Sequence, residues 1–375
     1  MGEQIQHEYT PDAVSPPGET LRELLEERNM SQRALAERMG RPTKTINEII
    51  NARTSITPET ALQLEKVLGT PAHFWNNREQ KYQEYLARLQ QNTQLEQVVD
   101  WIKKFPIKKM VKFGWIQGSS DEVEQLQILL SFLGVTSPKE WEQIYLQKKQ
   151  SAAFRQSLAY EPNPYAVSAW LRYGELVGKE VEVDGYDKNK FEHDLRVIRE
   201  MTRRSPEEFV PKMKELCTKC GVALVFTPQL PKTLVSGATR WLNPNKALIQ
   251  LSLRYKTNDH FWFTFFHEAA HILLHGKKDI FLENSKSTFD EEKEEQANNW
   301  AAKFLIPKNY FNEIASKAKS NRLNKRAVKQ YARELNIASG IIVGQLQHSK
   351  VLDYKYMNDL KRKFEWKHNI EKQED

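Results

Sequence analysis

The stretch His267-Glu268-Ala269-Ala270-His271 decides the fold of the C-terminal half of this 375-residue chain. Residues four apart lie on the same face of a helix, so the two imidazoles could converge on one metal ion at about 2.0–2.1 Å. Glu268 would then lie beside that ion, where a carboxylate can take a proton from water and pass it to a leaving amine. Zinc is the metal that this spacing typically holds, and the pattern predicts a hydrolase.

The residues on both sides of the motif favour a functional helix over a chance match. Residues 261–266 are almost all aromatic, and residues 272–274 are aliphatic. A helix buried beneath an active site would show this composition. The alternative is a buried helix whose histidines only satisfy core hydrogen bonds. We favour a zinc site, because the motif as a whole matches a known mechanism.

A third protein ligand is expected downstream, because a catalytic zinc usually takes three and leaves the fourth position for water. The metzincin pattern is excluded, since Leu274 and Lys277 stand where it has a Gly and its third His. His275 continues the four-residue spacing, but eight residues at about 1.5 Å rise put it roughly 12 Å from His267 along a straight helix. We therefore expect His275 to support another ligand from behind or to end the helix.

An acidic stretch over residues 291–302 offers that third ligand, and Glu294 is our choice. The small Ala297 would let this helix approach the metal helix closely, and Asn298 could orient a ligand through a hydrogen bond. Three competitors remain: Glu291, Glu292 and Glu295. Acidic groups also favour the start of a helix through its dipole, so most of these carboxylates need no metal to explain them.

Two motifs together, HEAAHILLH over residues 267–275 and ExxANxWAAxFLIP over residues 294–307, resemble those of the ImmA/IrrE metallopeptidases. The resemblance implies a zincin-like α+β fold in which His267, His271 and Glu294 hold Zn²⁺ and Glu268 is the acid/base. It also implies peptide substrates, often a partner transcription regulator. Short apolar runs at residues 222–226 and 247–251 independently predict a small sheet ahead of the metal helix.

A second informative region, residues 21–68, lies near the N-terminus and is predicted to form four short helices separated by breakers. Ser31 is placed to cap the second helix, and Gly40-Arg41-Pro42 forces a turn. The small Ala36 and an inward-facing Ile46 then describe two helices that cross tightly. This is the helix-turn-helix arrangement, which presents its second helix to the major groove of DNA.

DNA binding follows as a prediction from the side chains that this arrangement leaves facing outward. Base edges are expected to be read by Thr43, Lys44 and Asn47. Phosphates are expected to be contacted by Gln32, Arg33 and Arg53. The alternative is a protein-interaction module, since the local charge is nearly balanced rather than strongly basic.

Two stretches, Pro17-Gly18-Glu19-x-Leu21 and Leu68-Gly69-Thr70-Pro71-x-x-Phe74-Trp75, resemble the HigA-like branch of the phage-repressor helix-turn-helix family. The resemblance covers residues 16–90. It implies a five-helix domain that binds double-stranded operator DNA, commonly as a homodimer, and autoregulation. Some members of this branch are antitoxins.

The chain length and these motifs predict a mainly α, α+β protein with three parts: residues 16–90 bind DNA, residues 92–205 form a helical coupling region, and residues 206–366 form the peptidase domain. The net charge of +7 and the pI of about 9.0 weakly favour a polyanionic partner. A basic cluster over residues 317–333 could contact phosphates or simply be solvated.

The cysteines and the hydropathy point to the cytoplasm. Cys217 and Cys220 are the only two cysteines, and we expect them to be core-facing thiols rather than ligands of a structural zinc. The sequence has no run of 18 apolar residues and no signal-peptide pattern at its start, so membrane insertion is not expected.

Three functions fit the sequence. The preferred one is a DNA-binding regulator with a zinc endopeptidase that cuts a repressor, a partner protein or itself on a stress or phage signal. The second is a HigA-type antitoxin or repressor whose peptidase-like domain only senses a ligand or binds a partner such as a toxin. The third is a peptidase that uses its N-terminal helices as a protein dock.

Overall fold

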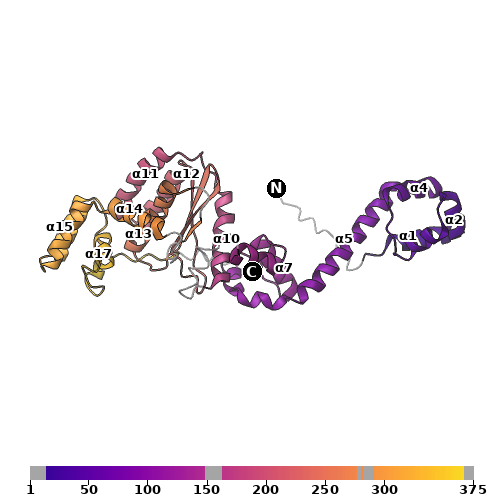
Figure 1. The fold of residues 1–375 in the computed structure, drawn as a ribbon, viewed down its shortest axis with the longest axis horizontal. Coiled ribbons are helices and arrows are strands. Elements are labelled where there is room, and N and C mark those ends of the chain that lie inside the picture. Colours follow the sequence, from indigo (N-terminus) through magenta and orange to yellow (C-terminus); the bar gives the residue numbers. More distant parts are fainter. Residues whose placement is uncertain (1–13, 148–162, 277–279, 283–290, 367–375) are drawn as a thin grey trace. The chain divides into compact units, whose positions relative to one another are not determined.

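The computed structural model describes residues 14–147, 163–276, 280–282 and 291–366 of the chain. The chain divides between Val99 and Asp100 into two compact units. Both units are mainly helical, and in the described ranges strands occur only in the second (Figure 1). The mainly α, α+β class is confirmed. None of the described helices is long and apolar enough to cross a membrane.

The first unit is a five-helix domain: the sequence predicted the first four helices, and the HigA-like resemblance implied the fifth. Its helices are α1 (Pro17–Glu27), α2 (Gln32–Met39), α3 (Thr43–Ile50), α4 (Pro58–Leu68) and α5 (Ala72–Glu96). Ser31 caps α2 by accepting a hydrogen bond from the amide of Ala34 at 3.1 Å. Gly40 ends α2 with a φ of 65°, a left-handed conformation that glycine adopts without strain. The turn between α2 and α3 is therefore set by Gly40, which ends α2, and Pro42, which precedes the first residue of α3.

One hydrophobic core holds these five helices together. Each helix contributes at least one fully buried side chain: Leu21, Leu35, Ile46, Leu64 and Trp75. Because Ile46, Ile49 and Ile50 of α3 all point into this core, the opposite face of α3 is left to solvent. That face carries the residues predicted to read DNA.

The second unit begins with short helices and continues into a mixed sheet. The elements before the sheet are η1 (Val99–Lys104), α6 (Ile107–Lys112), α7 (Glu122–Leu133), α8 (Pro138–Glu142), η2 (Gln143–Gln147), α10 (Pro164–Glu180), α11 (Lys188–Glu200), η4 (Met201–Arg203) and α12 (Pro206–Thr218). Cys217 in α12 and Cys220 just after it are both buried free thiols.

The sheet has the strand order β1-β3-β2-β4, with β1 (Val222–Phe226) parallel to β3 (Lys246–Leu251). Strand β2 (Gly237–Asn243) runs antiparallel to both β3 and β4 (Ile280–Leu282). The predicted runs at 222–226 and 247–251 are confirmed as β1 and β3. Strands β2 and β4 were not predicted.

Successive strand residues face opposite layers of helices. Val222 and Leu224 belong to the main core with α12 and α13, whereas Ala223 and Val225 pack with Val177 of α10. Helix α10 thus covers one face of the sheet, and α12 and α13 cover the other (Figure 1). Since α10 lies within the predicted coupling region, at least this part of that region is a layer of the second unit.

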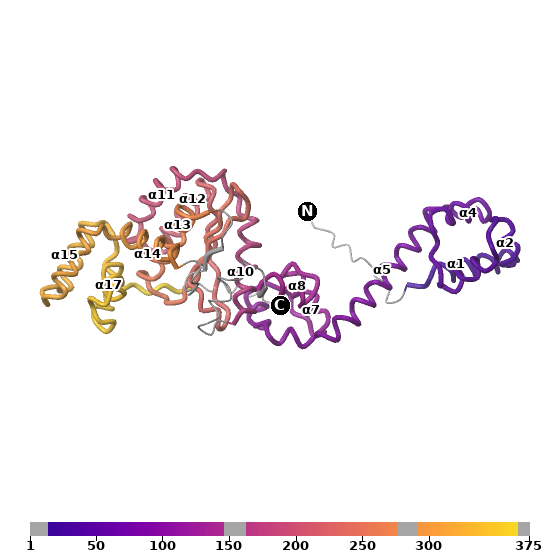
Figure 2. The backbone as a smooth tube through the Cα atoms, in the orientation of Figure 1, coloured from indigo at the N-terminus to yellow at the C-terminus, as the bar shows by residue number. Residues whose placement is uncertain are grey.

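The HExxH helix is the first of the helices that follow β3. They are α13 (Asn258–Leu274), α14 (Glu291–Leu305), α15 (Lys308–Lys319), α16 (Lys325–Glu334), α17 (Ser339–His348) and η5 (Asn358–Leu360). Helix α13, which carries the HExxH motif, packs closely against α14 and α17, and α13 and α14 lie side by side in both backbone views (Figure 1, Figure 2).

The residues after η5 return to the start of α13. The backbone amide of Asn258 donates to the carbonyl of Arg362 at 2.9 Å, and the Arg362 amide donates to Asn258 Oδ1 at 3.0 Å. Lys361 and Asp259 form an ion pair of 2.6 Å, with both side chains largely buried. Phe364 packs against Phe261. The first turn of α13 is therefore fastened by a segment a hundred residues away.

Candidate functional site

Three potential metal ligands converge between α13 and α14. His267 Nε2 and His271 Nε2 lie 3.0 Å apart, one turn from each other on α13. The Glu294 carboxylate approaches from α14, with 3.3 Å to His267 Nε2 and 3.4 Å to His271 Nε2. One ligand atom from each of the three residues lies within 4.8 Å of the ligand atoms of the other two. Two histidines and a glutamate are a known donor set for a catalytic zinc, so these residues fit that ion in chemistry and spacing.

The cluster is buried, and its burial sets the charge of its members. Burial lowers the pKa of His271 to about 4, although the neighbouring Glu294 carboxylate opposes this shift. Burial raises the pKa of Glu294, but the hydrogen bonds and charges of the two histidines outweigh it and bring that pKa to about 2. Near neutral pH the site therefore presents a neutral imidazole and a carboxylate, which are the forms that bind a metal.

His275 lies directly behind His271. It ends α13 as its C-cap, and its Nδ1 lies 2.9 Å from His271 Nδ1. The other His275 nitrogen, Nε2, is 3.3 Å from Gln296 Oε1 on α14. A hydrogen bond on the far nitrogen of an imidazole fixes which nitrogen remains available for a metal. His275 can therefore hold the His271 ring so that His271 Nε2 is directed at the cluster.

Glu268, the predicted acid/base, is fully buried on α13 between the two histidines. Strand β2 crosses it closely, and a Cβ atom built on Gly237 would lie 2.6 Å from Glu268 Oε1. The Thr239 hydroxyl of the same strand donates to the backbone carbonyl of Glu268 at 3.1 Å. Only glycine leaves room for the carboxylate here, so Gly237 is part of the site although no sequence motif contains it.

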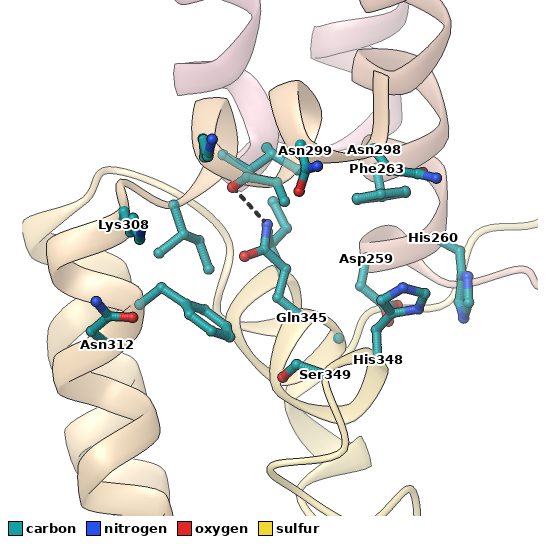
Figure 3. Close-up of a pocket in the computed structure, with 17 residues that line it drawn as sticks. Asp259, His260, Phe263, Asn298, Asn299, Lys308, Asn312, Gln345, His348 and Ser349 are labelled. Atoms are coloured by element: carbon teal, nitrogen blue, oxygen red, sulfur yellow. Dashed lines mark hydrogen bonds between the residues drawn. The ribbon is translucent and has the colours of Figure 1, made fainter. Parts of the chain in front are cut away.

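A cavity of about 540 Å³ lies between the helices that carry the cluster and α17, and Figure 3 shows the residues that line it. Phe263, one turn before His267, and Asn298, one turn after Glu294, are both on its wall. The Phe263 and His267 rings stack with centroids 6.3 Å apart. Gln345 of α17 reaches across the cavity and donates from Nε2 to the Ala302 carbonyl at 3.1 Å. The cavity wall thus begins one helical turn from the potential ligands on both helices.

The cavity wall is mostly apolar, with polar groups around it. Its apolar residues include Phe263, Leu305, Ile306, Phe311 and Ile341. Asn298, predicted to orient a ligand, is exposed at the cavity instead, and within the described ranges no hydrogen bond joins it to His267, His271 or Glu294. No contact in the described part of the chain therefore supports the prediction that Asn298 orients a ligand.

In the first unit, the predicted DNA-reading residues share one exposed surface. Thr43, Lys44 and Asn47 are exposed on α3. Asn47 is held on both sides: its Nδ2 donates to Gln32 Oε1 at 3.3 Å, and its Oδ1 accepts from Asn51 Nδ2 at 3.2 Å. Sequence reasoning had singled out Gln32 but missed Asn51, which follows Asn47 by one turn.

Of the three predicted phosphate contacts, Arg33 and Arg53 are also exposed, and Gln32 is half-buried. Arg33 pairs with Glu37 at 3.0 Å, and Arg53 lies just after α3. Lys44 lies 3.8 Å from Glu48 on its own helix. These long side chains are free of the core, so their exposed partners can be exchanged for DNA at little cost.

Two families match separate parts of the chain. The helix-turn-helix family matches residues 21–75. The IrrE N-terminal-like domain, of the peptidase M78 family, matches residues 218–338. The chain joins a helix-turn-helix domain to an IrrE-like domain. The second match contains α13, α14 and all three residues of the metal-ligand cluster.

One curated relative is similar to a short part of the chain. The helix-turn-helix-type transcriptional regulator YddM of Escherichia coli (strain K12), itself uncharacterised, is 33% identical over 61 residues, which make up 16% of this chain. The chain spans 65% of that regulator's length.

Two solved structures are similar over the same region. One is an addiction module antidote protein of a HigA family from Coxiella burnetii, with 35% identity over 22% of this chain and 92% of that chain, at a TM-score of 0.21. The other is the Pseudomonas aeruginosa antitoxin HigA solved with the higBA promoter, with 31% identity over 23% of this chain and 94% of that chain, at a TM-score of 0.22.

Proposed function

We propose that this protein is a cytoplasmic, sequence-specific DNA-binding regulator with a zinc-dependent endopeptidase domain, which cleaves a repressor, a partner protein or itself on a stress or phage signal. The observation that carries the proposal is the convergence of His267, His271 and Glu294 beside the buried Glu268. A domain that only sensed a ligand would need no acid/base beside its metal ligands. The match to the IrrE-like domain supports the same reaction class.

The residues of the site would have separate roles in this reaction. Zinc, when bound by His267, His271 and Glu294, would polarise the scissile carbonyl and acidify water. Glu268 would take one proton from the water as its oxygen forms the new C–O bond, and would then deliver that proton to the leaving amine as the C–N bond breaks. The cavity beside Phe263 gives a peptide segment an apolar place next to the reacting carbonyl.

Metal analysis of the full chain tests the site. We expect one zinc per chain by mass spectrometry, lost in His267→Ala and in Glu294→Gln. Glu295→Gln is the matched control, because Glu295 is exposed on the same helix and outside the cluster. Zinc retained in Glu294→Gln would move the third ligand elsewhere, and no metal in the wild-type protein would contradict a zinc site.

Glu268→Gln tests whether the site works as an enzyme. We expect zinc to stay bound and cleavage to fall by roughly 10²- to 10⁴-fold, the usual contribution of a general acid/base. Intact-mass spectrometry of the chain, alone and mixed with regulators encoded beside its gene, would detect the products. If this variant binds zinc and leaves the cellular phenotype unchanged, the alternative is correct: a HigA-type antitoxin or repressor whose peptidase-like domain only senses a ligand or binds a partner.

The DNA-binding half of the proposal rests on the exposed face of α3, and we propose that a homodimer presents two such helices to operator DNA. Lys44→Ala and Asn47→Ala should each cost about 1–3 kcal/mol of discrimination against non-operator DNA. Lys66→Ala on α4 removes the same charge away from that face and is the control. If neither α3 variant changes the footprint on operator DNA, α3 does not contact the bases of the major groove through Lys44 and Asn47.

A further inference from the structure

A second cavity of the C-terminal unit, of about 290 Å³, is lined by cationic side chains and has no part in the proposed reaction. The four cations come from three segments: Arg203 from η4, Lys329 and Arg333 from α16, and Arg362 after η5. The other lining residues of this cavity are Ala332, Ile337, Ala338 and Ser339, so no carboxylate is among its described lining. Of these four cations, the basic cluster predicted over residues 317–333 contains only Lys329 and Arg333.

Two of these guanidinium groups are held in place by neutral oxygens. Arg362 donates to the backbone carbonyl of Arg204 at 3.1 Å and to that of Arg203 at 2.7 Å. Arg203 donates to Asn336 Oδ1 at 3.1 Å. Carbonyl and amide oxygens orient a guanidinium without cancelling its charge, so both groups keep their full positive charge at the cavity.

No ion pair neutralises the four cations within the described part of the chain. Asp359 interacts electrostatically with Lys329 of this cavity, but it lies 2.9 Å from Lys325, with which it forms an ion pair. One carboxylate already paired with Lys325 leaves the cavity with a surplus of positive charge. Like charges around one concave space repel each other, and an anion bound there would relieve that repulsion.

The start of α17 adds backbone donors to the same cavity. Ala338 is the N-cap and supplies no capping side chain, and Ser339 is the first residue of the helix. The amide of Ala338 already donates to Thr202 Oγ1 at 3.1 Å, and that of Ile341 donates to the Ala338 carbonyl at 3.0 Å. Ser339 and Gly340 are then the residues of this first turn whose amides have no acceptor within the helix. Together with the helix dipole, they favour an anion at this end.

We infer that this cavity binds a small phosphorylated ligand, with the phosphate oxygens between Arg333, Arg362 and the first turn of α17. A cavity near the lower end of the size range for small-molecule sites suits a pyrophosphate or nucleotide better than the extended backbone of DNA. Arginine guanidinium groups match the oxygens of a phosphate, and four cations match its charge.

Helix α17 connects this cavity to the candidate substrate cavity. Ser339 lines the cationic cavity, and Ile341, Gln345 and His348 farther along the same helix line the 540 Å³ cavity. A phosphorylated ligand would thus hold one end of the helix whose other end forms a wall beside the metal-ligand cluster. The binding itself does not depend on the proposed peptidase function.

Calorimetric titration of the full chain with phosphate, pyrophosphate and ADP tests the inference. We expect saturable binding of at least one of these probes, and a loss of roughly tenfold or more in affinity for each phosphate contact removed in Lys329→Gln/Arg333→Gln. The control is Arg322→Gln/Arg326→Gln, which removes the same charge from exposed residues outside the cavity. Thermal unfolding of both variants checks that they fold.

Three results would overturn the inference. One is the absence of saturable binding for all three probes, and another is equal affinity in the wild type and in Lys329→Gln/Arg333→Gln. The third comes from a random-sequence DNA duplex: if only duplex binding weakens in that variant, the surface serves the DNA backbone instead. Since zinc content is measured separately, failure here would leave the peptidase proposal untouched.

Discussion

At the scale of single residues, the buried carboxylate of Glu268 depends on a neighbour with no side chain. Glu268 lies on α13, whereas Gly237 lies on β2, thirty-one positions earlier in the chain. A Cβ atom on Gly237 would come 2.6 Å from Glu268 Oε1 and 2.7 Å from Thr264 Cγ2. Real atoms do not approach so closely, so any larger residue must displace the carboxylate or the strand.

Gly237→Ala should therefore reduce cleavage while leaving zinc bound. A displacement of about 1 Å at a catalytic group costs roughly 10²-fold in rate. Zinc content and cleavage rate would be measured together, with Gly185→Ala as the control, because a Cβ there meets nothing within 4 Å. If Gly237→Ala cleaves at the wild-type rate, the Glu268 carboxylate works without the close packing against Gly237, and the prediction is wrong.

The sequence indicated part of this site and was silent about the rest. The spacing of His267 and His271 is local, so helix geometry alone predicted that they would meet, and the choice of Glu294 among several acidic neighbours agrees with the observed cluster. Gly237 could not be found this way, because its approach to Glu268 depends on how β2 crosses α13. The proximity of Arg203, Arg333 and Arg362 likewise follows from tertiary packing, not from any spacing along the chain.

At the scale of elements, a cluster of charges joins α10 to strand β2. Glu175 of α10 lies 2.7 Å from Arg240 of β2, and on its own helix it lies 3.0 Å from Arg172 and 2.7 Å from Lys179. Burial raises the pKa of Glu175, but these three cations outweigh it and bring the pKa to about 2. The carboxylate therefore stabilises the contact between helix and sheet in its charged form.

Glu175→Gln should lower the free energy of unfolding by roughly 1–3 kcal/mol near neutral pH, since it leaves partly buried cations without their partner. The folded-state pKa lies below the ordinary value of 4.5, so this stabilisation is present above about pH 4.5 and is lost as the pH falls toward 2. Urea unfolding at several pH values would show the two proteins converging in acid. Glu180→Gln, exposed on the same helix, is the control, and a constant gap would contradict the role of charge.

The elements themselves were predicted where the local signal was strong. The runs at β1 and β3 are apolar and rich in β-branched or aliphatic residues, and the helices of the first unit carry caps and breakers at their ends. Strand β2 reads Gly-Ala-Thr-Arg-Trp-Leu-Asn, which has no clear alternation. It becomes a strand because β3 and β4 lie on either side of it, and that information is not local.

At the scale of the whole molecule, the helix-turn-helix domain and the metal-ligand cluster lie in different compact units. The helix-turn-helix domain has its own core around Trp75, and the metal-ligand cluster is enclosed by the core of the second unit around Trp262. Cores that are separate should respond separately to a ligand that binds only one of them.

Zinc removal should therefore lower the unfolding temperature of the second unit alone. A ligand present at a hundred times its Kd stabilises the state that binds it by about 2.7 kcal/mol. Differential scanning calorimetry with and without a chelator would show one transition move and the other stay, and His267→Ala should be insensitive to the chelator. A shift of both transitions would mean that the units unfold as one.

The segment that fastens the start of α13 limits how long the candidate site can stay intact. Lys361, Arg362 and Phe364 hold the first turn of the helix that carries His267 and His271. A cut just before Lys361 would remove no metal ligand, yet it would free that turn and loosen the cluster beyond it. If the proposed peptidase made this cut in its own chain, it would inactivate itself, and the rate of that single event would set the duration of each response.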